Sequence, residues 1–210
     1  MLELRDLHYQ PATLETPVLQ GVSLRAEPGR PVLISGASGS GKTSLIEVIS
    51  GLAATQQGSV SWNGEPLNRR QRRWLCGLLF QFPERHFLGL SVSQELKLGH
   101  RRLGSERMHG VLRRVGLTDV NLKQAPERLS GGQQRRLALA VQLLREPDVL
   151  LLDEPTAGLD WSVRDEVLDL LQRLAADKVL IVVTHEPDLF AGWTCERRML
   201  QAGQLRVLSP

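Results

Sequence analysis

The sequence lacks a hydrophobic stretch long enough to cross a bilayer. A transmembrane helix needs about 20 apolar residues, whereas the short apolar runs at residues 149–152 and 179–183 stop at Asp153 and Thr184. The amino terminus also lacks the apolar segment of a signal peptide and the acid-free character of a transit peptide. We therefore expect a chain that does not span a membrane and that acts in the compartment where it is made.

Cysteine is scarce as well. Cys76 and Cys195 lie far apart in the sequence and belong to no CxxC or Cys/His pattern. Neither a disulfide framework nor a cysteine metal site is therefore indicated. We expect both cysteines to be buried structural residues in a reducing compartment.

Lysine is scarce although the net charge is +3. Aromatic residues are also few, although hydrophobic residues make up 41% of the chain. A basic excess is found in proteins that bind nucleic acid or an anionic membrane surface. Here the excess is arginine in scattered doublets, and no series of aromatic residues is interleaved with them as in single-strand binders. We expect the doublets to lie on solvated helix faces, and we expect no nucleic-acid partner.

The order of apolar patterns predicts an α/β fold. Period-two alternation at the amino terminus, at residues 2–4 and 22–24, indicates half-buried strands. Runs of strand length then alternate with helical spacing, which is typical of a mostly parallel sheet covered by helices. The predicted strands cover residues 31–35, 58–62, 76–80, 149–152 and 179–183, and the predicted helices cover residues 42–50, 106–115, 133–145 and 163–174.

The 210 residues suit one large domain or a core with an insertion. The strand signal disappears between residues 84 and 147, where the spacing is helical. We therefore expect a single domain over residues 1–210, with a core at residues 1–83 and 148–210 and a helical insertion at about residues 84–147.

Residues 36–43 fit the pattern GxxxxGK[ST] between a predicted strand and a predicted helix. Such a loop lets backbone N–H groups converge on phosphate oxygens, and the helix behind it adds its positive amino end. The lysine would reach the β- and γ-phosphates, and the threonine hydroxyl would face Mg²⁺. The alternative is a flexible Gly/Ser connection. The predicted ATP-binding residues here are Gly36, Ala37, Ser38, Gly39, Ser40, Gly41, Lys42, Thr43 and Ser44.

Two carboxylates follow the buried run at residues 149–152. Asp153 and Glu154 would therefore lie at the carboxyl edge of the sheet, where α/β proteins bind ligands. Successive side chains of a strand point in opposite directions, so the two acids need not share a task. Asp153 would hold Mg²⁺, and Glu154 would act as general base toward the attacking water. The alternative is that the acids cap a helix or form a turn.

The sequence LSGGQ at residues 129–133, twenty residues before Asp153, makes the whole chain resemble the ABC-type ATPases. The resemblance implies a P-loop core with a mostly parallel sheet, an antiparallel β subdomain at the amino-terminal side and an inserted helical subdomain. It also implies that Gln81 is the Q-loop glutamine, which contacts Mg²⁺ and the attacking water. Asp160 would be the D-loop aspartate and His185 the switch histidine. Taken alone, Gln81 and His185 would fit ordinary polar residues at strand ends.

The family architecture also implies a stoichiometry. Ser130, Gly131, Gly132 and Gln133 open a helix, which is a second anion-binding terminus in addition to the P-loop. The resemblance implies that they contact the ATP of a partner protomer, so that two ATP molecules lie between two head-to-tail subunits. A second ATPase subunit, identical or different, is therefore an expected partner.

The adenine contact departs from the family pattern. The family usually has an aromatic residue four positions after the strand leucine, and counting from Leu7 this position is Pro11. The single tyrosine of the chain, Tyr9, is two positions earlier. Either Tyr9 stacks on adenine through a shifted loop, or it has a packing role.

Within the superfamily, residues 80–87 look most like importers of the energy-coupling-factor type, which take up vitamins, nickel or cobalt, and like their cyanobacterial and plastid relatives. Those members more often have glutamine at the position of His86. The resemblance implies that an integral membrane subunit docks near residues 81–90, where residues 85–90 line a groove that receives one of its short helices. The alternative is a solvent-facing loop, but clustered apolar residues such as Phe82, Phe87 and Leu90 usually mark an interaction site.

The sequence therefore predicts a Mg²⁺-dependent ATPase subunit, peripheral at the cytoplasmic or stromal face of a membrane. ATP binding and hydrolysis would drive a separate membrane protein, an importer of a metal ion or vitamin. One alternative is a non-transport ABC ATPase of iron–sulfur assembly, DNA repair or translation. Another is a regulatory nucleotide-binding module without turnover, which the presence of Glu154 and His185 disfavours.

Overall fold

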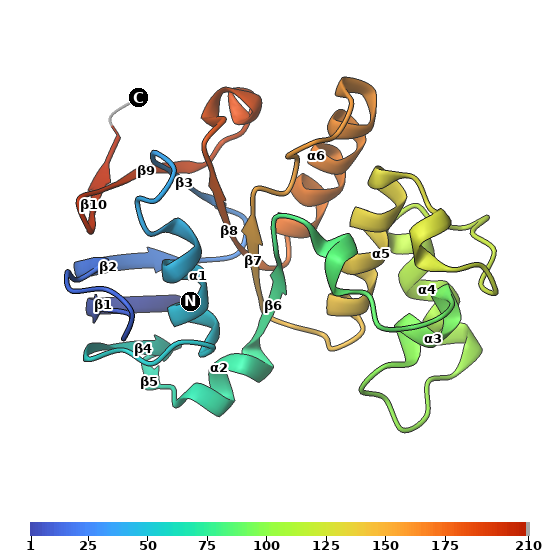
Figure 1. Cartoon of the computed structure of the whole chain (residues 1–210), viewed down its shortest axis with the longest axis horizontal. Helices are drawn as coiled ribbons and strands as arrows, with labels where there is room; N and C mark the ends of the chain where they lie inside the picture. The colour runs from blue at the N-terminus through green and yellow to red at the C-terminus, as the bar shows by residue number, and fades with distance from the viewer. Residues whose placement is uncertain (209–210) are drawn as a thin grey trace. The chain divides into compact units, whose positions relative to one another are not determined.

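The structure is a computed structural model that describes residues 1–208, apart from the side chain of Glu84. Two compact units are seen in Figure 1. The first, called here the sheet unit, comprises residues 1–78, 147–154 and 171 onward. The second, called here the helical unit, comprises residues 79–146 and 155–170.

One sheet of the sheet unit is antiparallel, with strand order β2-β1-β4-β5. Along most of β2, buried and exposed residues alternate, as the period-two pattern predicts. Asn63 and Gly64 both have positive φ, at 51° and 87°, which is the backbone of a tight hairpin turn between β4 and β5. The four strands are β1 (Leu2–Tyr9), β2 (Leu19–Ala26), β4 (Gln57–Trp62) and β5 (Glu65–Pro66).

The second sheet has the order β10-β9-β3-β8-β7-β6. Strands β9, β3, β8 and β7 are parallel neighbours, and β9 and β10 form an antiparallel hairpin. Every residue of β3, β7 and β8 is buried, as expected for central parallel strands. The strands are β3 (Val32–Ser35), β6 (Cys76–Leu79), β7 (Val149–Asp153), β8 (Val179–Thr184), β9 (Glu196–Gln201) and β10 (Gln204–Val207).

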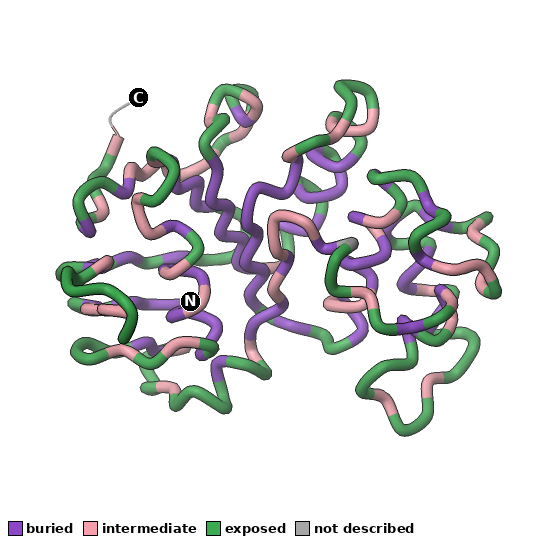
Figure 2. Tube along the Cα trace, viewed as in Figure 1, coloured by how far each residue is buried: buried purple, intermediate pink, exposed green. Residues whose placement is uncertain are grey.

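Helix α1 (Lys42–Ser50) joins the two sheets through one hydrophobic core. Its apolar residues Leu45, Ile46 and Ile49 are fully buried with residues from both sheets. Figure 2 shows the central strands of the larger sheet as almost continuously buried. Helix α2 (Arg69–Leu75) contacts α1, and a short 3₁₀ turn, η3 (Pro187–Phe190), follows β8. The helix after the Gly-rich loop is thus fixed from several sides.

The helical unit contains helices and turns between residues 80 and 146. Helix α6 begins in this unit and ends in the sheet unit. Among residues 1–208, no helix has the length and apolarity that a membrane span requires. The elements are η1 (Pro83–His86), α3 (Val92–Lys97), α4 (Ser105–Arg114), η2 (Pro126–Arg128), α5 (Gly131–Leu143) and α6 (Trp161–Ala175).

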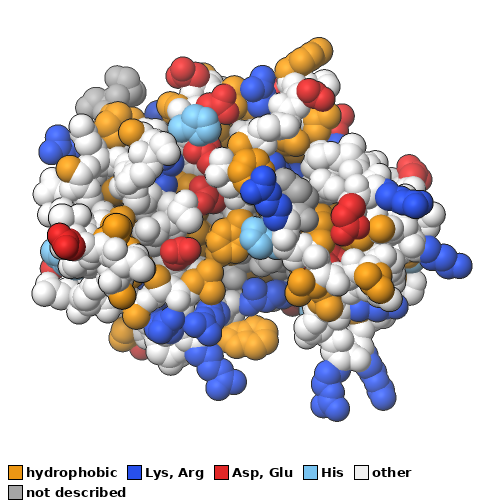
Figure 3. All heavy atoms as spheres, in the orientation of Figure 1, with side chains coloured by type: hydrophobic (Ala, Val, Ile, Leu, Met, Phe, Trp, Pro, Cys, Tyr) orange, Lys and Arg blue, Asp and Glu red, His pale blue; other side chains and the backbone are white. Residues whose placement is uncertain are grey.

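The expectation that arginine doublets lie on solvated faces is wrong at two positions. Arg72 and Arg135 are 5% and 3% exposed, because their guanidinium groups bond to backbone carbonyl oxygens inside the protein. Other Lys and Arg side chains occur at separate places on the visible face, with acidic side chains between them (Figure 3). The expectation for cysteine is half right, because Cys76 is buried and Cys195 is only half-buried.

Candidate active site

The Gly-rich loop connects β3 to α1 in the sheet unit, as the sequence predicts. Two of its glycines have no room for a side chain. A Cβ on Gly36 would lie 2.6 Å from the carbonyl oxygen of Leu200, and a Cβ on Gly41 would lie 2.6 Å from Cγ1 of Val18. Gly41 also has a φ of 98°, which favours glycine. Glycine is therefore required here for the loop to form at all.

The loop leaves polar groups available for an anion. Gly41 caps α1 without a side-chain acceptor, so the first N–H groups of the helix are not satisfied by a cap. The buried hydroxyl of Ser40 has no hydrogen-bond partner among the described residues. Lys42 Nζ donates to the carbonyl oxygens of Gly36 at 2.8 Å and Ala37 at 3.1 Å, which keeps its charge beside the loop. This arrangement fits a phosphate group.

Thr43 and Asp153 meet although 110 residues separate them in the chain. The Thr43 hydroxyl donates to Asp153 Oδ2 at 2.7 Å. Burial raises the pKa of Asp153, an effect that the Thr43 hydrogen bond and the Lys42 charge oppose. A hydroxyl oxygen and a carboxylate oxygen side by side are the ligand types that Mg²⁺ prefers, so these residues fit that ion.

Glu154 is held in one orientation by its neighbours at the end of β8. Its carboxylate accepts hydrogen bonds from the Thr184 hydroxyl and from the backbone N–H of His185, both at 2.8 Å. Its own N–H donates to the Val183 carbonyl oxygen at 2.9 Å. Glu154 is buried and has a φ of 47°, a strained value for a non-glycine residue. The surrounding bonds therefore fix both its backbone and its carboxylate.

His185 makes a second contact with the same carboxylate. Its Nδ1 lies 2.7 Å from Glu154 Oε1, while about half of the imidazole side chain is exposed. This hydrogen bond raises the pKa of His185. The pair therefore combines a positioned carboxylate with an imidazole that reaches the solvent, which suits proton transfer and hydrogen bonding to a bound substrate.

The three parts of this site share one edge of the sheet. Strand β8 lies between β3 and β7, and all three are parallel. The Gly-rich loop follows β3, Glu154 follows β7 and His185 follows β8. The carboxyl ends of these three strands thus bring together the residues that the sequence predicts to bind phosphate, to bind the metal ion and to act on the attacking water.

Tyr9 ends β1 in the same unit. It is half-buried and packs against the hydrophobic core, and its carbonyl oxygen accepts the N–H of Val18 at 2.8 Å. Val18 in turn lies against Gly41 of the loop. The adenine contact of Tyr9 stays a prediction beside its packing role.

The LSGGQ segment opens α5 in the helical unit with a capping box. The Ser130 hydroxyl accepts the N–H of Gln133 at 3.3 Å, and the Gln133 side chain accepts the N–H of Ser130 at 3.0 Å. A Cβ on Gly132 would lie 2.1 Å from Cγ1 of Val163 on α6, whereas a Cβ on Gly131 would lie 3.6 Å from Leu159. Two glycines that look alike in the sequence thus have different surroundings.

Gln81 and Asp160 also lie in the helical unit. Gln81 is half-buried after β6. Asp160 is exposed, and its carbonyl oxygen accepts the N–H of Arg164 at 2.9 Å in the first turn of α6. Arg135 of α5 donates to the carbonyl oxygen of Ala157 at 2.9 Å. This buried guanidinium joins the segment before Asp160 to the helix that carries LSGGQ.

The sequence reasoning missed Thr184 and the arginines of α2. Thr184 is fully buried and is a direct partner of Glu154, which its place before His185 could have signalled. Arg69, Arg72 and Arg73 donate to carbonyl oxygens at the carboxyl end of α1, on Val48, Gly51 and Leu52. They satisfy carbonyls that a helix end leaves open, and their charge complements the helix dipole. The helix that starts at Lys42 is therefore held at both ends.

A Gly-rich loop before a buried helix, with Asp153 and Glu154 at the same sheet edge, defines a P-loop ATPase. The family model described as "ABC transporter" matches residues 19–157. The chain belongs to the ABC transporter family, as an ATP-binding ATPase subunit.

The chain is 39% identical over 201 residues to "ABC transporter I family member 11, chloroplastic" of Arabidopsis thaliana, covering 88% of this chain and 72% of that one. It is 34% identical over 207 residues to the "Energy-coupling factor transporter ATP-binding protein EcfA2" of Acetivibrio thermocellus, covering 93% and 74%. The structure resembles that of cbiO1 from Clostridium perfringens, described as part of the ABC transporter complex cbiONQ. The TM-score is 0.85 at 28% identity, covering 98% of this chain and 86% of that one. The family and the fold expected from the sequence are confirmed.

Proposed function

We propose that the edge of the sheet unit formed by the P-loop, Asp153, Glu154 and His185 hydrolyses Mg-ATP to drive a separate membrane subunit. The hydrogen bond of 2.7 Å between Thr43 and Asp153 carries the proposal, because it joins the phosphate loop to the end of β7, directly before the proposed general base Glu154. The backbone of residues 36–41 and the side chains of Lys42, Thr43 and Ser44 bind the phosphates. Tyr9 contributes the adenine contact.

Thr43 and Asp153 would hold Mg²⁺, and Gln81 is the third proposed ligand. When bound, the ion supplies positive charge to the phosphate oxygens. Lys42, which already lies beside the loop carbonyls at 2.8 Å and 3.1 Å, turns to the phosphates when ATP enters. The Ser40 hydroxyl, which has no hydrogen-bond partner in the part of the chain that the structure describes, is a further donor for the phosphates.

Glu154 acts as general base toward the attacking water. Its support is the set of hydrogen bonds from Thr184 and His185, which leave the carboxylate in one orientation before substrate binds. His185 orients the water or the γ-phosphate through its exposed imidazole. Catalysis by positioning and charge stabilisation is what phosphoryl transfer requires.

A second ATPase subunit completes each site. The amino end of α5, with Ser130, Gly131, Gly132 and Gln133, would contact the ATP of that partner, and Asp160 would lie at the same interface. The capping box supports this role because it fixes the first turn of α5. The turn contains no acidic side chain, so no negative charge there opposes a phosphate group.

The membrane subunit docks near residues 81–90. Leu88 and Leu90 are 80% and 83% exposed, which supports an interaction surface there. Relatives named as energy-coupling factor and cbiO proteins support an importer of a vitamin or a metal ion as the transported solute class. The chain then works at the cytoplasmic or stromal face of the membrane, as one domain with its helical insertion at about residues 84–147.

The test uses Glu154→Gln, with Glu186→Gln as the matched control on the neighbouring exposed carboxylate. Glu154→Gln should retain ATP, stop hydrolysis and elute as a dimer in Mg-ATP, whereas Glu186→Gln should hydrolyse ATP as the unmodified chain does. A strictly monomeric Glu154→Gln protein would contradict the shared site. Purification of the native complex in mild detergent should yield an integral membrane subunit, and recovery with iron–sulfur machinery or nucleic acid instead would contradict the transport function.

A further inference from the structure

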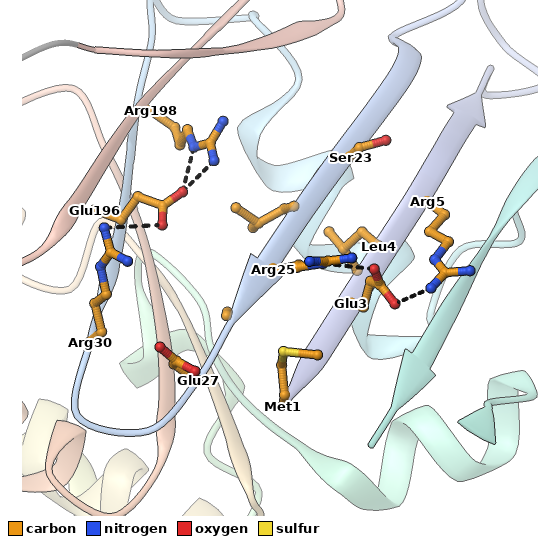
Figure 4. Close-up of a pocket in the computed structure, with 12 residues that line it drawn as sticks. Met1, Glu3, Leu4, Arg5, Ser23, Arg25, Glu27, Arg30, Glu196 and Arg198 are labelled. Carbon is orange, nitrogen blue, oxygen red and sulfur yellow. Dashed lines mark hydrogen bonds and ion pairs between the residues drawn. The ribbon is translucent and has the colours of Figure 1, made fainter. Parts of the chain in front are cut away.

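The sheet unit contains a hollow near the end of β3 that is opposite the P-loop. Its volume is about 630 Å³, within the range of small-molecule sites. Glu196, which lines it, pairs with Val32 at the amino end of β3, whereas the P-loop follows the carboxyl end of β3. Figure 4 shows the hollow between strands β1 and β2 on one side and the start of β9 on the other.

One wall is built around Glu3 of β1. Arg5 Nη2 donates to Glu3 Oε2 at 2.7 Å, and Arg25 Nε of β2 donates to Glu3 Oε1 at 2.8 Å. The carboxylate is 8% exposed, while both guanidinium side chains are about two-thirds exposed. The hydrogen bonds from Arg5 and Arg25 lower the pKa of Glu3, which keeps the carboxylate ionised. A buried anion thus orients two cations toward the solvent.

The opposite wall has a less exposed cluster around Glu196 of β9, in which the Arg198 side chain is 20% exposed and the Arg30 side chain is 61% exposed. Arg198 Nε donates to Glu196 Oε1 at 2.6 Å, and Arg30 lies 3.8 Å from Glu196 Oε2. Figure 4 places this group across the hollow from the group around Glu3, with Glu27 between them. The four guanidinium groups outnumber the three carboxylates of the lining, so the hollow keeps a positive excess.

Each wall is suited to one phosphate group. A guanidinium has five N–H donors in a rigid fork, and the carboxylate that holds it uses only part of them. A phosphate offers three oxygens that accept from two guanidiniums at once, whereas a carboxylate offers two. Because hydrogen bonds to Glu3 and Glu196 already hold the guanidinium groups of Arg5, Arg25 and Arg198, these three side chains lose little freedom when an anion binds.

We propose that this hollow binds a small molecule with two phosphate groups, one against Arg5 and Arg25 and the other against Arg30 and Arg198. The site is separate from the ATP site, so both are filled at the same time. It would let a phosphorylated metabolite bind the ATPase subunit without competing for the P-loop.

The test is calorimetric titration of the full chain with fructose 1,6-bisphosphate as the probe. An excess of a non-hydrolysable ATP analogue with Mg²⁺ keeps the P-loop occupied. We expect one probe molecule per chain, bound at least tenfold more tightly than inorganic phosphate or succinate. Arg25→Gln and Arg198→Gln, one on each wall, should each weaken binding about tenfold or more. Arg206→Gln on the exposed surface of β10 should leave it unchanged.

The absence of saturable binding would overturn the proposal. Equal weakening by Arg206→Gln would also overturn it, because attraction would then depend on net charge alone. Equal affinity for inorganic phosphate would contradict the two-walled site, and equal affinity for succinate would contradict the phosphate class. If a glutamine variant unfolds, Arg25→Lys and Arg198→Lys keep the charge but lose the fork, and they too should bind the probe more weakly.

Discussion

Nδ1 of His185 lies 2.7 Å from Oε1 of Glu154, and the same oxygen accepts the backbone N–H of His185 at 2.8 Å. Two bonds from one residue to one oxygen align the imidazole with the carboxylate. Glu154, the proposed general base, and His185 therefore form one hydrogen-bonded unit, and the geometry of one depends on the other.

This contact predicts the titration of His185. The carboxylate stabilises the imidazolium and raises its pKa, so NMR titration of the ring should give a value above that of an ordinary histidine. The stabilisation is fully present below the ordinary pKa and is lost as the pH rises through the raised one. Glu154→Gln should lower the pKa of His185, and Glu186→Gln should lower it less. An unchanged value in Glu154→Gln would show that the contact is absent in solution.

The Thr43–Asp153 bond predicts the dependence on Mg²⁺. Thr43→Val keeps the shape but removes the hydroxyl, so the Mg²⁺ concentration for half-maximal hydrolysis should rise about 10–100-fold. Thr43→Ser should restore the ordinary requirement, and chelation with EDTA should stop hydrolysis in every variant. Identical Mg²⁺ curves for Thr43→Val and Thr43→Ser would exclude the hydroxyl as a metal ligand.

The burial of Arg72 at the carboxyl end of α1 leads us to expect that this residue contributes to the free energy of unfolding. Its Nη1 donates to the Val48 carbonyl oxygen at 2.6 Å, at the end of the P-loop helix, and burial lowers its pKa. Arg72→Met fills similar space but removes this donor, and we expect the free energy of unfolding in urea to fall by about 1–3 kcal/mol. Arg70→Met on the exposed face of α2 should change it by less than about 0.5 kcal/mol. Equal effects of the two variants would contradict the capping role.

The two glycines of LSGGQ, Gly131 and Gly132, should differ in what a substitution by alanine impairs: fold stability at one position and ATP hydrolysis at the other. Gly132→Ala places a methyl group against Val163, so it should destabilise the fold by about 1–3 kcal/mol, and Val163→Ala should restore the stability. Gly131→Ala meets only an ordinary contact with Leu159, so its unfolding should be normal while its hydrolysis is impaired at the subunit interface. Thermal unfolding and ATPase rates distinguish the two. Normal stability in Gly132→Ala would contradict the packing of α5 on α6.

The elements around the P-loop are predictable from the sequence because their apolar patterns each fit one kind of secondary structure. The apolar residues of β3, β7 and β8 form runs that only a buried strand of this length explains, and all three are fully buried. The predicted helices appear within two residues at each end, at α1, α4, α5 and α6. Strand ends then fix the edge at which Asp153 and Glu154 lie.

Helix α2 is not predictable from the sequence, because the groups that it contacts leave no pattern in the sequence. Four of its seven residues are arginine, so it has no apolar periodicity. Its contacts are backbone carbonyl oxygens at the end of α1, which any residue supplies. The link from Arg135 to the Ala157 carbonyl oxygen is hidden for the same reason. Side chains that bond to backbone are revealed only when the chain folds.

The rate of ATP hydrolysis by Glu154→Gln, relative to the unmodified chain, tests the central claim most directly. Both proteins should bind ATP with similar affinity, because Glu154 contacts Thr184 and His185 rather than the loop that holds the phosphates. The variant should hydrolyse ATP at least about 10²-fold more slowly, as expected for loss of a general base. A Glu154→Gln protein that binds and hydrolyses ATP at the unmodified rate would contradict the account.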